Sequence, residues 1–302
     1  MTHGAPVAAP VAVVIPTFNH AHYLGDAIAS VLAQTVPPAD ILVVDDGSLD
    51  HPEEVVAAHP GVRLLRQENR GLAAARNTGL WGTSAPFLLF LDADDELRPQ
   101  AIERSVERLS QAPLAAFSYG AYADKLMPSG EVVEAAFRPV PREAFPEFLR
   151  VNPIGMHGTV MYRRQCLEAV GGFRERLAAS EDYDVYLRLS MNYQVTCGPE
   201  VLANYRQHGQ NMSTDPAFML QAVLRVLHSH RSAAIERGRQ VDYRAGLKDW
   251  KLHYLTVWAQ RINRDGVDAR ALRQGLTLAR LAPLEMALKV IRVAASRSGR
   301  SA

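Results

Sequence analysis

Residues 87–96 read Phe-Leu-Leu-Phe-Leu-Asp-Ala-Asp-Asp-Glu, so five consecutive apolar residues end directly in a cluster of carboxylates. A short apolar run of this kind is typical of a strand that is buried on both faces, as in a parallel sheet. Asp92 and Asp94 are two residues apart on the following turn, where both carboxylates can converge on one hard cation, Mg²⁺ or Mn²⁺. The alternative is an acidic turn in which Asp94 or Asp95 caps the next helix.

The same alternation of short apolar strands and amphipathic helices continues on both sides of this stretch. Short strands that alternate with helices form a mostly parallel central sheet between helices, which is the α/β fold class. Ligands of such sheets bind at the carboxyl ends of the strands. We expect strands at Val11–Ile15, Ile41–Val44, Val62–Arg66 and Phe87–Leu91, and helices at Ala21–Gln34, Pro52–His59, Leu72–Gly79 and Gln100–Ser110.

The pattern changes after the fourth of these strands. A turn at residues 127–130 predicts a hairpin between Ala115–Ala123 and Glu131–Ala136. Beyond it we expect a strand at His157–Tyr162 and helices at Glu143–Arg150, Arg164–Val170 and Glu181–Met191. After Ser213 only helices are expected, at Phe218–Arg237, Asp242–Arg264 and Ala269–Ala295. The sequence therefore predicts a flexible N-terminus over residues 1–10, an α/β domain over 11–215 and a helical C-terminal region over 216–302.

The composition narrows the classes of function. The 302 residues include 33 Lys and Arg against 32 Asp and Glu, a net charge of +1 that argues against a dedicated nucleic-acid binder. Two cysteines, Cys166 and Cys197, exclude a disulfide scaffold and lack zinc-site spacing. We see no signal peptide or membrane span and expect a cytoplasmic protein. Residues 261–302 hold nine basic and three acidic residues, so the near-neutral total conceals a basic tail of +6.

Two further turns carry polar groups at the expected strand ends. The turn Asp45-Asp46-Gly47-Ser48 follows the second strand, and Pro16-Thr17-Phe18-Asn19 closes the first. A carboxylate in such a position can accept hydrogen bonds from a nucleobase or a ribose, and Arg76 in the expected third helix can reach a phosphate or the base. Each segment is also compatible with an ordinary turn or helix surface, because Asp, Gly and Ser favour turns and alanine favours helices.

Six segments together resemble a known family. They are VAVVIPTFN (11–19), ILVVDDGSLD (41–50), GLAAARNTG (71–79), LLFLDADDEL (88–97), GGFRERLAASEDYDVYLRL (171–189) and YRQHGQNMS (205–213). In this order the set is similar to the family 2 glycosyltransferases, which are inverting enzymes with the GT-A fold. The resemblance covers about two-thirds of the chain. Phe18 stands where tyrosine is common in the family, which keeps an aromatic ring at that position.

The resemblance implies roles for the residues around the donor. Asp92 and Asp94 match the DxD motif, in which one carboxylate contacts the ribose and the other the metal. Asp46 or its neighbour Asp45 would hold the base or ribose, and Arg76 would approach the base or the diphosphate. The implied nucleotide-sugar contacts are Pro16, Thr17, Asn19, Asp45, Asp46, Arg76, Asp92 and Ala93.

The resemblance also implies a catalytic base and a second metal ligand. Asp182, in Glu181-Asp182-Tyr183, matches the general base of the family, and His208 lies where some relatives place a metal or phosphate ligand. The alternatives are an acidic residue that the helix dipole favours, with Glu181 as a rival base, and a loop histidine bonded to backbone. The metal ligands are therefore expected to be Asp94 and His208, with Mn²⁺ or Mg²⁺ as the cofactor.

The expected activity is inverting, metal-dependent transfer of a sugar, with a UDP-sugar favoured, to a hydroxyl of a saccharide, lipid-linked or other acceptor. Such reactions serve the synthesis of bacterial cell-surface polysaccharide, lipopolysaccharide or glycoconjugates. A basic helix over Leu281–Arg297 would allow peripheral contact with the inner face of the membrane, or else an oligomer contact. The alternative function is a non-catalytic nucleotide-sugar binding scaffold. A degenerate copy would be expected to lose Asp92, Asp94 or Asp182, and all three are present.

Overall fold

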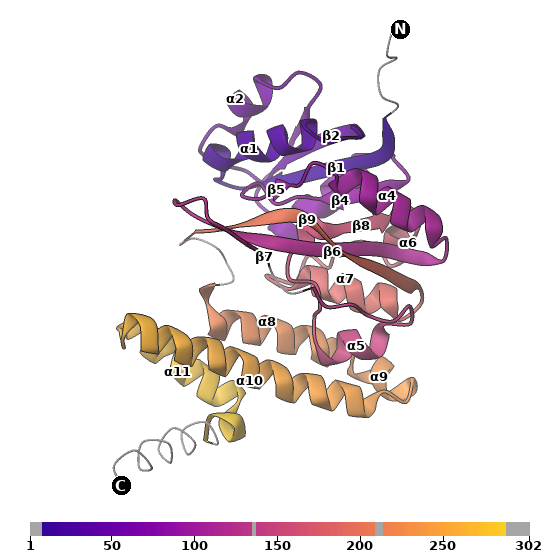
Figure 1. The fold of residues 1–302 in the computed structure, drawn as a ribbon. Coiled ribbons are helices and arrows are strands. Elements are labelled where there is room, and N and C mark those ends of the chain that lie inside the picture. Colours follow the sequence, from indigo (N-terminus) through magenta and orange to yellow (C-terminus); the bar gives the residue numbers. More distant parts are fainter. Residues whose placement is uncertain (1–7, 135–136, 209–213, 288–302) are drawn as a thin grey trace, which may run out of the picture. The chain divides into compact units, whose positions relative to one another are not determined.

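The computed structural model describes residues 8–134, 137–208 and 214–287 and divides into two compact units (Figure 1). The first unit runs to His208 and omits only Leu149–Val151. Those three residues join the segment that begins at Gly209 to make the second unit.

Four parallel strands form one half of the sheet in the first unit. They are β1 (Ala9–Thr17), β2 (Pro38–Asp45), β3 (Arg63–Arg66) and β4 (Phe87–Phe90), in the order β3-β2-β1-β4. The connections between them contain α1 (Ala21–Leu32), α2 (Pro52–Ala57) and α3 (Leu72–Trp81). This arrangement confirms the predicted α/β class. β1 starts at Ala9, so residues 9 and 10 of the expected flexible N-terminus lie in a strand.

Successive residues of β1 are buried on opposite faces of the sheet, as the pleat requires. Val13 and Ile15 belong to a core cluster with Leu24 and Ile28 of α1, together with residues of α4 (Ala101–Gln111). On the other face, α3 packs closely on β1. A Cβ at Gly79 of α3 would lie 2.2 Å from a methyl carbon of Val14, so only glycine fits at this contact.

The other half of the sheet is mixed. β8 (Val160–Arg163) is antiparallel to both β4 and β6 (Ala115–Leu126), and β9 (Gln194–Gln207) is parallel to β6. β7 (Val132–Glu134) forms the predicted hairpin with β6, and β5 (Glu96–Leu97) pairs with β9. The remaining elements of this unit are α5 (Phe145–Arg150), a 3₁₀ turn (His157–Thr159) before β8, α6 (Arg164–Ala169) and α7 (Glu181–Ser190).

The 14-residue strand β9 has no counterpart in the sequence-based expectations. Its sequence, QVTCGPEVLANYRQ, contains a Gly-Pro pair and no sustained alternation of apolar and polar residues. The structure accommodates the pair because the register with β6 shifts there: Tyr119 pairs with Cys197, but Ala121 pairs with Val201.

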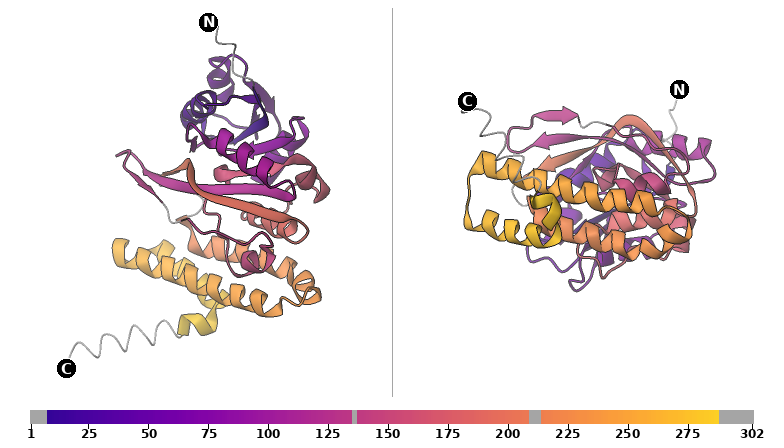
Figure 2. Two further views of the ribbon diagram at one scale, coloured as in Figure 1. Left: turned by 45° about the vertical axis from the view of Figure 1, so that its right-hand side comes forward. Right: turned by 90° about the horizontal axis from the view of Figure 1, so that it is seen from below.

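The second unit is helical and contains α8 (Pro216–Ser229), α9 (Arg231–Glu236), α10 (Gln240–Asp265) and α11 (Ala269–Leu281) (Figure 2). Asp215 caps α8 by accepting from the backbone N–H groups of Ala217 and Phe218. The predicted helix Phe218–Arg237 is divided at His230, which belongs to neither helix.

The predicted helix Ala269–Ala295 is wrong in extent, because α11 ends at Leu281 and Ala282 is non-helical. Pro283 follows, and a proline disfavours the helical conformation of the residue before it. Most of the expected basic helix at Leu281–Arg297 lies outside the described residues. No helix in the described ranges has both the length and the apolar character that crossing a membrane requires.

Candidate active site

Three of the polar turns meet at one edge of the first unit because their parent strands are paired. Thr17 at the end of β1 pairs with Asp45 at the end of β2, and the backbone N–H of Asp46 donates to the Thr17 carbonyl at 2.9 Å. On the other side of β1, Val14 pairs with Phe90, one residue before the Leu91 that leads into the acidic turn. The structure therefore brings together the turns at residues 16–19, 45–48 and 92–95.

The two carboxylates of the second turn have different surroundings. Both oxygens of Asp46 are engaged: Oδ1 accepts from the Arg70 backbone at 2.9 Å and Oδ2 from the Gly71 backbone at 2.8 Å. Asp45 is fully buried, and its Oδ1 accepts from the Ser48 backbone at 2.8 Å. Among the described residues its Oδ2 accepts no hydrogen bond, although Arg66 Nε lies 3.4 Å away. Asp45 therefore keeps an acceptor atom that the described residues leave without a hydrogen bond.

The turn after β1 adds a second polar atom of this kind. Thr17 is buried, and its hydroxyl has no hydrogen-bond partner within the described part of the chain. Asn19 has φ of 55°, the left-handed conformation that asparagine tolerates better than most residues. Its backbone N–H donates to Ser48 Oγ at 3.0 Å, and its side-chain oxygen accepts from the Leu49 backbone at 2.9 Å. Asn19 thus ties the first turn to the second.

Arg76 of α3 joins the acidic turn to the start of α7. Its guanidinium donates to Asp92 Oδ1 at 2.7 Å and also forms a hydrogen bond and ion pair with Glu181, which is 105 residues away in sequence. The guanidinium carbon lies 5.7 Å from the centre of the Phe173 ring. The Arg76 side chain is only 2% exposed, whereas that of Asp92 is 32% exposed. Arg76 is therefore an internal connection between two acidic segments.

The paired acids at the start of α7 have altered proton affinities. Burial raises the pKa of Glu181 to about 7, although the charge of Arg76 opposes this shift. Burial also raises the pKa of Asp182, and Arg76 again acts in the opposite direction. Ser180 directly before them has φ of 60°, which non-glycine residues rarely adopt. Perturbed carboxylates beside a strained residue are typical of functional sites.

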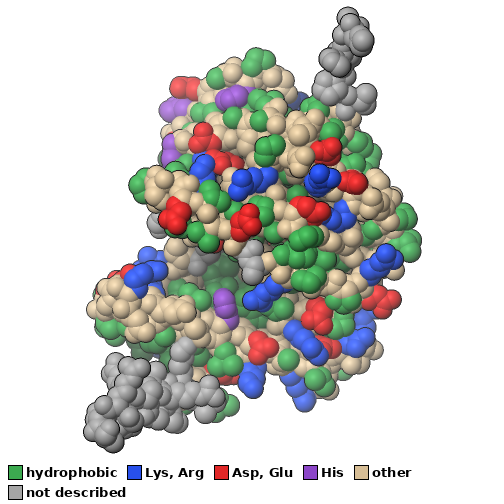
Figure 3. Space-filling model, in the orientation of Figure 1, with side chains coloured by type: hydrophobic (Ala, Val, Ile, Leu, Met, Phe, Trp, Pro, Cys, Tyr) green, Lys and Arg blue, Asp and Glu red, His purple; other side chains and the backbone are tan. Residues whose placement is uncertain are grey.

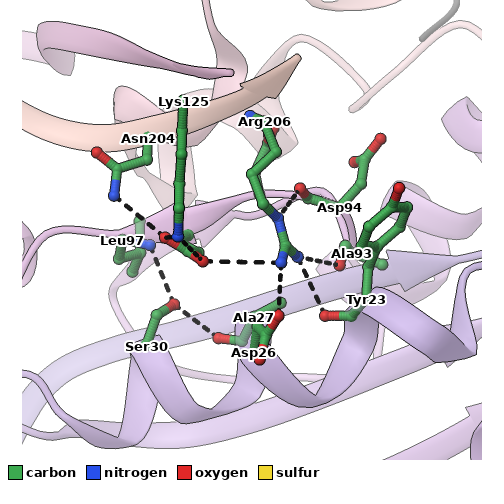
Figure 4. A network of polar contacts seen from close by, with 12 residues as sticks. Tyr23, Asp26, Ala27, Ser30, Ala93, Asp94, Leu97, Lys125, Asn204 and Arg206 are labelled. Carbon is green, nitrogen blue, oxygen red and sulfur yellow. Dashed lines mark hydrogen bonds and ion pairs between the residues drawn. The ribbon is translucent and has the colours of Figure 1, made fainter. Parts of the chain in front are cut away.

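Arg206 holds the acidic turn against α1 and β9 (Figure 4). Its side chain is 1% exposed, and its Nη1 donates to Asp26 at 2.7 Å. Other guanidinium N–H groups donate to the backbone carbonyls of Tyr23, Ala93 and Asp94. This residue was missed as a site residue by sequence reasoning, although it stands two positions before His208 in a segment that the family resemblance includes.

Asp95 is a structural member of the same turn. Its Oδ1 accepts from the Arg206 backbone N–H at 2.9 Å, and the side chain is buried. Burial raises the pKa of Asp95 well above its ordinary value, and the neighbouring Asp94 charge adds to the effect. The proposed cap of the next helix is not observed for Asp95 or Asp94, because Gln100 occupies the N-cap of α4.

Asp94 and His208 lie side by side, as two ligands of one metal ion would. His208 Nε2 is 3.1 Å from Asp94 Oδ2, and the imidazole is stacked on the Tyr23 ring with centroids 4.9 Å apart. His20 Nδ1 lies 3.9 Å from the same carboxylate oxygen and was not expected at the site. Within the described ranges, no group of three or more His, Cys, Asp or Glu side chains has the geometry to hold an ion alone. A carboxylate and an imidazole suit an ion whose remaining ligands come from phosphates and water.

The fold and the site define the class to which the protein belongs. A sheet of this kind, with an acidic turn after its fourth strand, is similar to that of the GT-A glycosyltransferases, and C-terminal helices follow it. A family profile described as "Glycosyl transferase family 2" matches residues 12–171, which is more than half of the chain. The protein belongs to this family.

Individual relatives agree with this assignment. The chain is 27% identical over 210 residues to chondroitin synthase of Pasteurella multocida (strain Pm70), in a match that covers 67% of this chain and 21% of the relative. It therefore spans about a fifth of that relative's length. The crystal structure of S. aureus TarS 1–349 has a TM-score of 0.65 at 16% identity, covering 90% of this chain and 81% of that one. The mannosyltransferase PcManGT from Pyrobaculum calidifontis has a TM-score of 0.57 at 19% identity, covering 93% and 84%.

Proposed function

We propose that the protein transfers a sugar from a nucleotide-diphospho-sugar to an acceptor hydroxyl, with inversion at the anomeric carbon. The observation that carries this proposal is the connection made by Arg76. It links Asp92 of the acidic turn to Glu181, the neighbour of the candidate base Asp182. One buried cation thus connects the acidic turn to the residue directly before the candidate base. TarS has been crystallised in complex with UDP-GlcNAc, which supports a donor of this class.

The nucleotide would be recognised at the ends of β1 and β2. Asp45 Oδ2 and the Thr17 hydroxyl are buried polar atoms without hydrogen-bond partners among the described residues, and a buried polar atom in this state favours a ligand that satisfies it. A nucleobase N–H and ribose hydroxyls are donors of the required kind. Asp46 is already occupied by the 67–71 segment and would shape the pocket, with Pro16 and Asn19 beside it. We favour UDP as the nucleotide.

A divalent cation, Mn²⁺ or Mg²⁺, would be held by Asp94 and His208. The Asp94 carboxylate fits, because Mg²⁺ and Mn²⁺ prefer oxygen ligands and are commonly bound through one or two protein groups plus substrate phosphates. The imidazole nitrogen of His208 is a softer donor and favours Mn²⁺ over Mg²⁺. When bound, such an ion supplies neutralisation of the charge that develops on the departing diphosphate. The structure of PcManGT contains both GDP-Man and Mn²⁺, which supports metal use in a protein of similar fold.

Asp182 would act as the general base. It accepts the proton of the acceptor hydroxyl as the hydroxyl oxygen attacks the anomeric carbon from the face opposite the leaving diphosphate. General-base assistance of this kind contributes roughly 10²–10⁴-fold to the rate. The raised pKa of Asp182 brings its proton affinity closer to the working pH, which favours proton transfer. Glu181 is the rival base, but its ion pair with Arg76 engages it.

The acceptor would be a saccharide or a lipid-linked glycan used in cell-surface polysaccharide, lipopolysaccharide or glycoconjugate synthesis. The similarity to chondroitin synthase supports a saccharide acceptor. Peripheral contact with the membrane through the basic C-terminal segment would suit a lipid-linked acceptor, since residues 261–302 carry a net charge of +6.

Released nucleotide and product stereochemistry together test the proposal. The full chain is incubated with Mn²⁺, a panel of UDP-, dTDP- and GDP-sugars and a mixture of saccharide acceptors, and nucleoside diphosphate is measured. Nuclear magnetic resonance of the product then reports the anomeric configuration. We expect one donor to be consumed in an acceptor-dependent way with inversion. Tight nucleotide-sugar binding without turnover for any acceptor would instead favour the non-catalytic scaffold, and a retained configuration would contradict the mechanism.

A further inference from the structure

The helical unit contains a cleft of about 310 Å³ whose lining includes two arginines and a histidine. Arg231 of α9, Arg244 of α10 and His228 at the end of α8 line it, and none of the described lining residues is a carboxylate. α9 and the start of α10 are adjacent along the chain and lie at the same end of the helical unit (Figure 1). A volume of this size is at the lower end of the range of small-molecule sites, which begins at roughly 300 Å³.

The two arginines of the cleft have no acidic partner among the described residues. Both side chains are exposed, and neither forms an ion pair with a described Asp or Glu. The nearest acid in sequence, Asp242, is buried and already paired with Arg150 at 2.7 Å. On the face drawn in Figure 3, acidic and basic side chains are interspersed. The cleft is therefore a local concentration of unpaired positive charge.

The backbone adds to this positive character. Gln240, the first residue of the 26-residue helix α10, lines the cleft. The side chain of the N-cap residue Arg239 makes no capping hydrogen bond, so no side chain at the N-cap position satisfies the first N–H groups of α10. Uncapped N–H groups at a helix N-terminus and the helix dipole both favour an anion.

The remaining lining groups suit a polar molecule larger than an ion. Tyr243 is 5% exposed and lines the cleft, where its hydroxyl can donate or accept a hydrogen bond. Burial raises the pKa of Tyr243 while the charge of Arg231 lowers it, which indicates that this guanidinium lies near the phenol. Ile235 and Leu247 provide apolar contact area against which the face of a sugar ring can pack.

We propose that this cleft binds a phosphate group carried on a small hydroxylated molecule, of the sugar-phosphate class. Arg231 and Arg244 contact the phosphate, His228 and the start of α10 add further donors, and Gln240 and Tyr243 contact the hydroxyl groups. The two guanidinium groups can each form charge-assisted, bidentate hydrogen bonds with phosphate oxygens. This binding site lies within the helical unit and does not depend on the proposed transfer reaction. The phosphate could belong to a phosphorylated saccharide or be free inorganic phosphate.

Calorimetric titration of the full chain tests the proposal with three probes: glucose 1-phosphate, inorganic phosphate and glucose. UDP and Mn²⁺ are present in excess, so that the donor site is filled. We expect both phosphates to bind and glucose not to bind. Tighter binding of glucose 1-phosphate than of inorganic phosphate identifies the sugar phosphate as the ligand, and equal affinities identify free phosphate. Failure of both phosphates to bind at millimolar concentrations overturns the proposal.

Substitutions at the cleft test whether the phosphate binds there. The double variant Arg231→Gln/Arg244→Gln should weaken phosphate binding at least tenfold. The matched control Arg225→Gln/Lys248→Gln removes two charges from α8 and α10 at exposed positions outside the cleft and should change affinity less than twofold. Ile235→Glu is a second test, because Ile235 is 45% exposed and a carboxylate there should repel the ligand without disturbing a core. Equal weakening by the control pair, or no weakening by both cleft variants, would show that phosphate binds elsewhere.

Discussion

His208 Nε2 lies 3.1 Å from Asp94 Oδ2, although 114 residues separate the two in sequence. The contact joins the last residue before the helical unit to the acidic turn after β4. Tyr23 stacks on the imidazole and restricts its orientation. The proposed cation site would therefore be preorganised, since little side-chain freedom is left for its two ligands to lose.

The metal proposal predicts that Asp94→Ala or His208→Ala weakens Mn²⁺ binding. Each variant removes one of the two protein ligands, so we expect the affinity for Mn²⁺ in the presence of UDP to fall at least tenfold. The fraction of free Mn²⁺, measured by electron paramagnetic resonance, reports this without any assay of transfer. Glu107→Gln, at an exposed carboxylate of α4, is the control and should bind Mn²⁺ normally. A wild-type affinity for UDP that EDTA leaves unchanged would contradict the metal role.

The base proposal predicts that Asp182→Asn abolishes transfer but spares donor binding. Asparagine keeps the size of the side chain and removes its basicity, so kcat should fall by about 10²–10⁴-fold. The dissociation constant for UDP, measured by calorimetry, should stay within twofold of the wild-type value. Asp249→Asn, an exposed site on α10, serves as the control. Turnover of Asp182→Asn near the wild-type rate would move the base assignment to another residue, with Glu181 the first to examine.

The paired acids predict a specific pH dependence. The base must be ionised, so the raised pKa of Asp182 moves the acidic limb of the kcat/KM profile to higher pH than an ordinary aspartate would give. Glu181→Gln removes the neighbouring carboxylate and keeps an oxygen that can accept from Arg76. The loss of this negative charge favours ionised Asp182, and so does the positive charge of Arg76, which Glu181 no longer compensates. The acidic limb should therefore move to lower pH. An unmoved limb, or one displaced upward, would show that Glu181 and Asp182 do not interact in this way.

The buried guanidinium of Arg206 predicts a large effect on stability. Arg206→Ala leaves the carbonyls of Ala93 and Asp94 without these donors and Asp26 without its partner. Asp26 is itself exposed, so the main cost comes from the two carbonyls. Leaving a buried polar group without a hydrogen bond costs roughly 1–3 kcal/mol, and we expect a loss of about 2–6 kcal/mol from urea unfolding monitored by circular dichroism. Arg104→Ala breaks an exposed pair with Glu107 and should cost less than about 1 kcal/mol. Similar losses for the two variants would show that Arg206 is not a structural anchor.

The parallel half of the fold could be predicted because its signals are local. The strands β1, β2 and β4 are each buried on both faces over a continuous apolar run, at residues 11–15, 41–44 and 87–90, and helical periodicity separates these runs. The strand β9 could not be found in this way. It lies beside β6, and this long-range pairing stabilises a sequence that has a Gly-Pro pair and little alternation. The pairing also makes the second half of the sheet mixed, which no local pattern indicated.

The parts of the site that lie at strand ends or in sequence motifs could be predicted. The turns at residues 45–48 and 92–95 follow from the position of polar residues after apolar runs. The unsatisfied oxygen of Asp45 and the full engagement of Asp46 depend on hydrogen bonds from the 67–71 segment, which only the three-dimensional arrangement reveals. The proximity of His20 to Asp94 depends likewise on the packing of α1 against the acidic turn, and a lone histidine after a turn carries no signal of it.

The geometry at the end of β9 limits where the chain can gain or lose residues. Arg206 and His208 are two residues apart, so an extended chain points both side chains to the same side. Arg206 there donates to the Asp94 carbonyl, and His208 contacts the Asp94 carboxylate. Inserting or deleting one residue in β9 after the Gly-Pro pair would turn both away together and disconnect the turn from its support. Homologous chains should therefore vary in length at the 127–130 hairpin turn and keep a constant spacing from Val201 to His208.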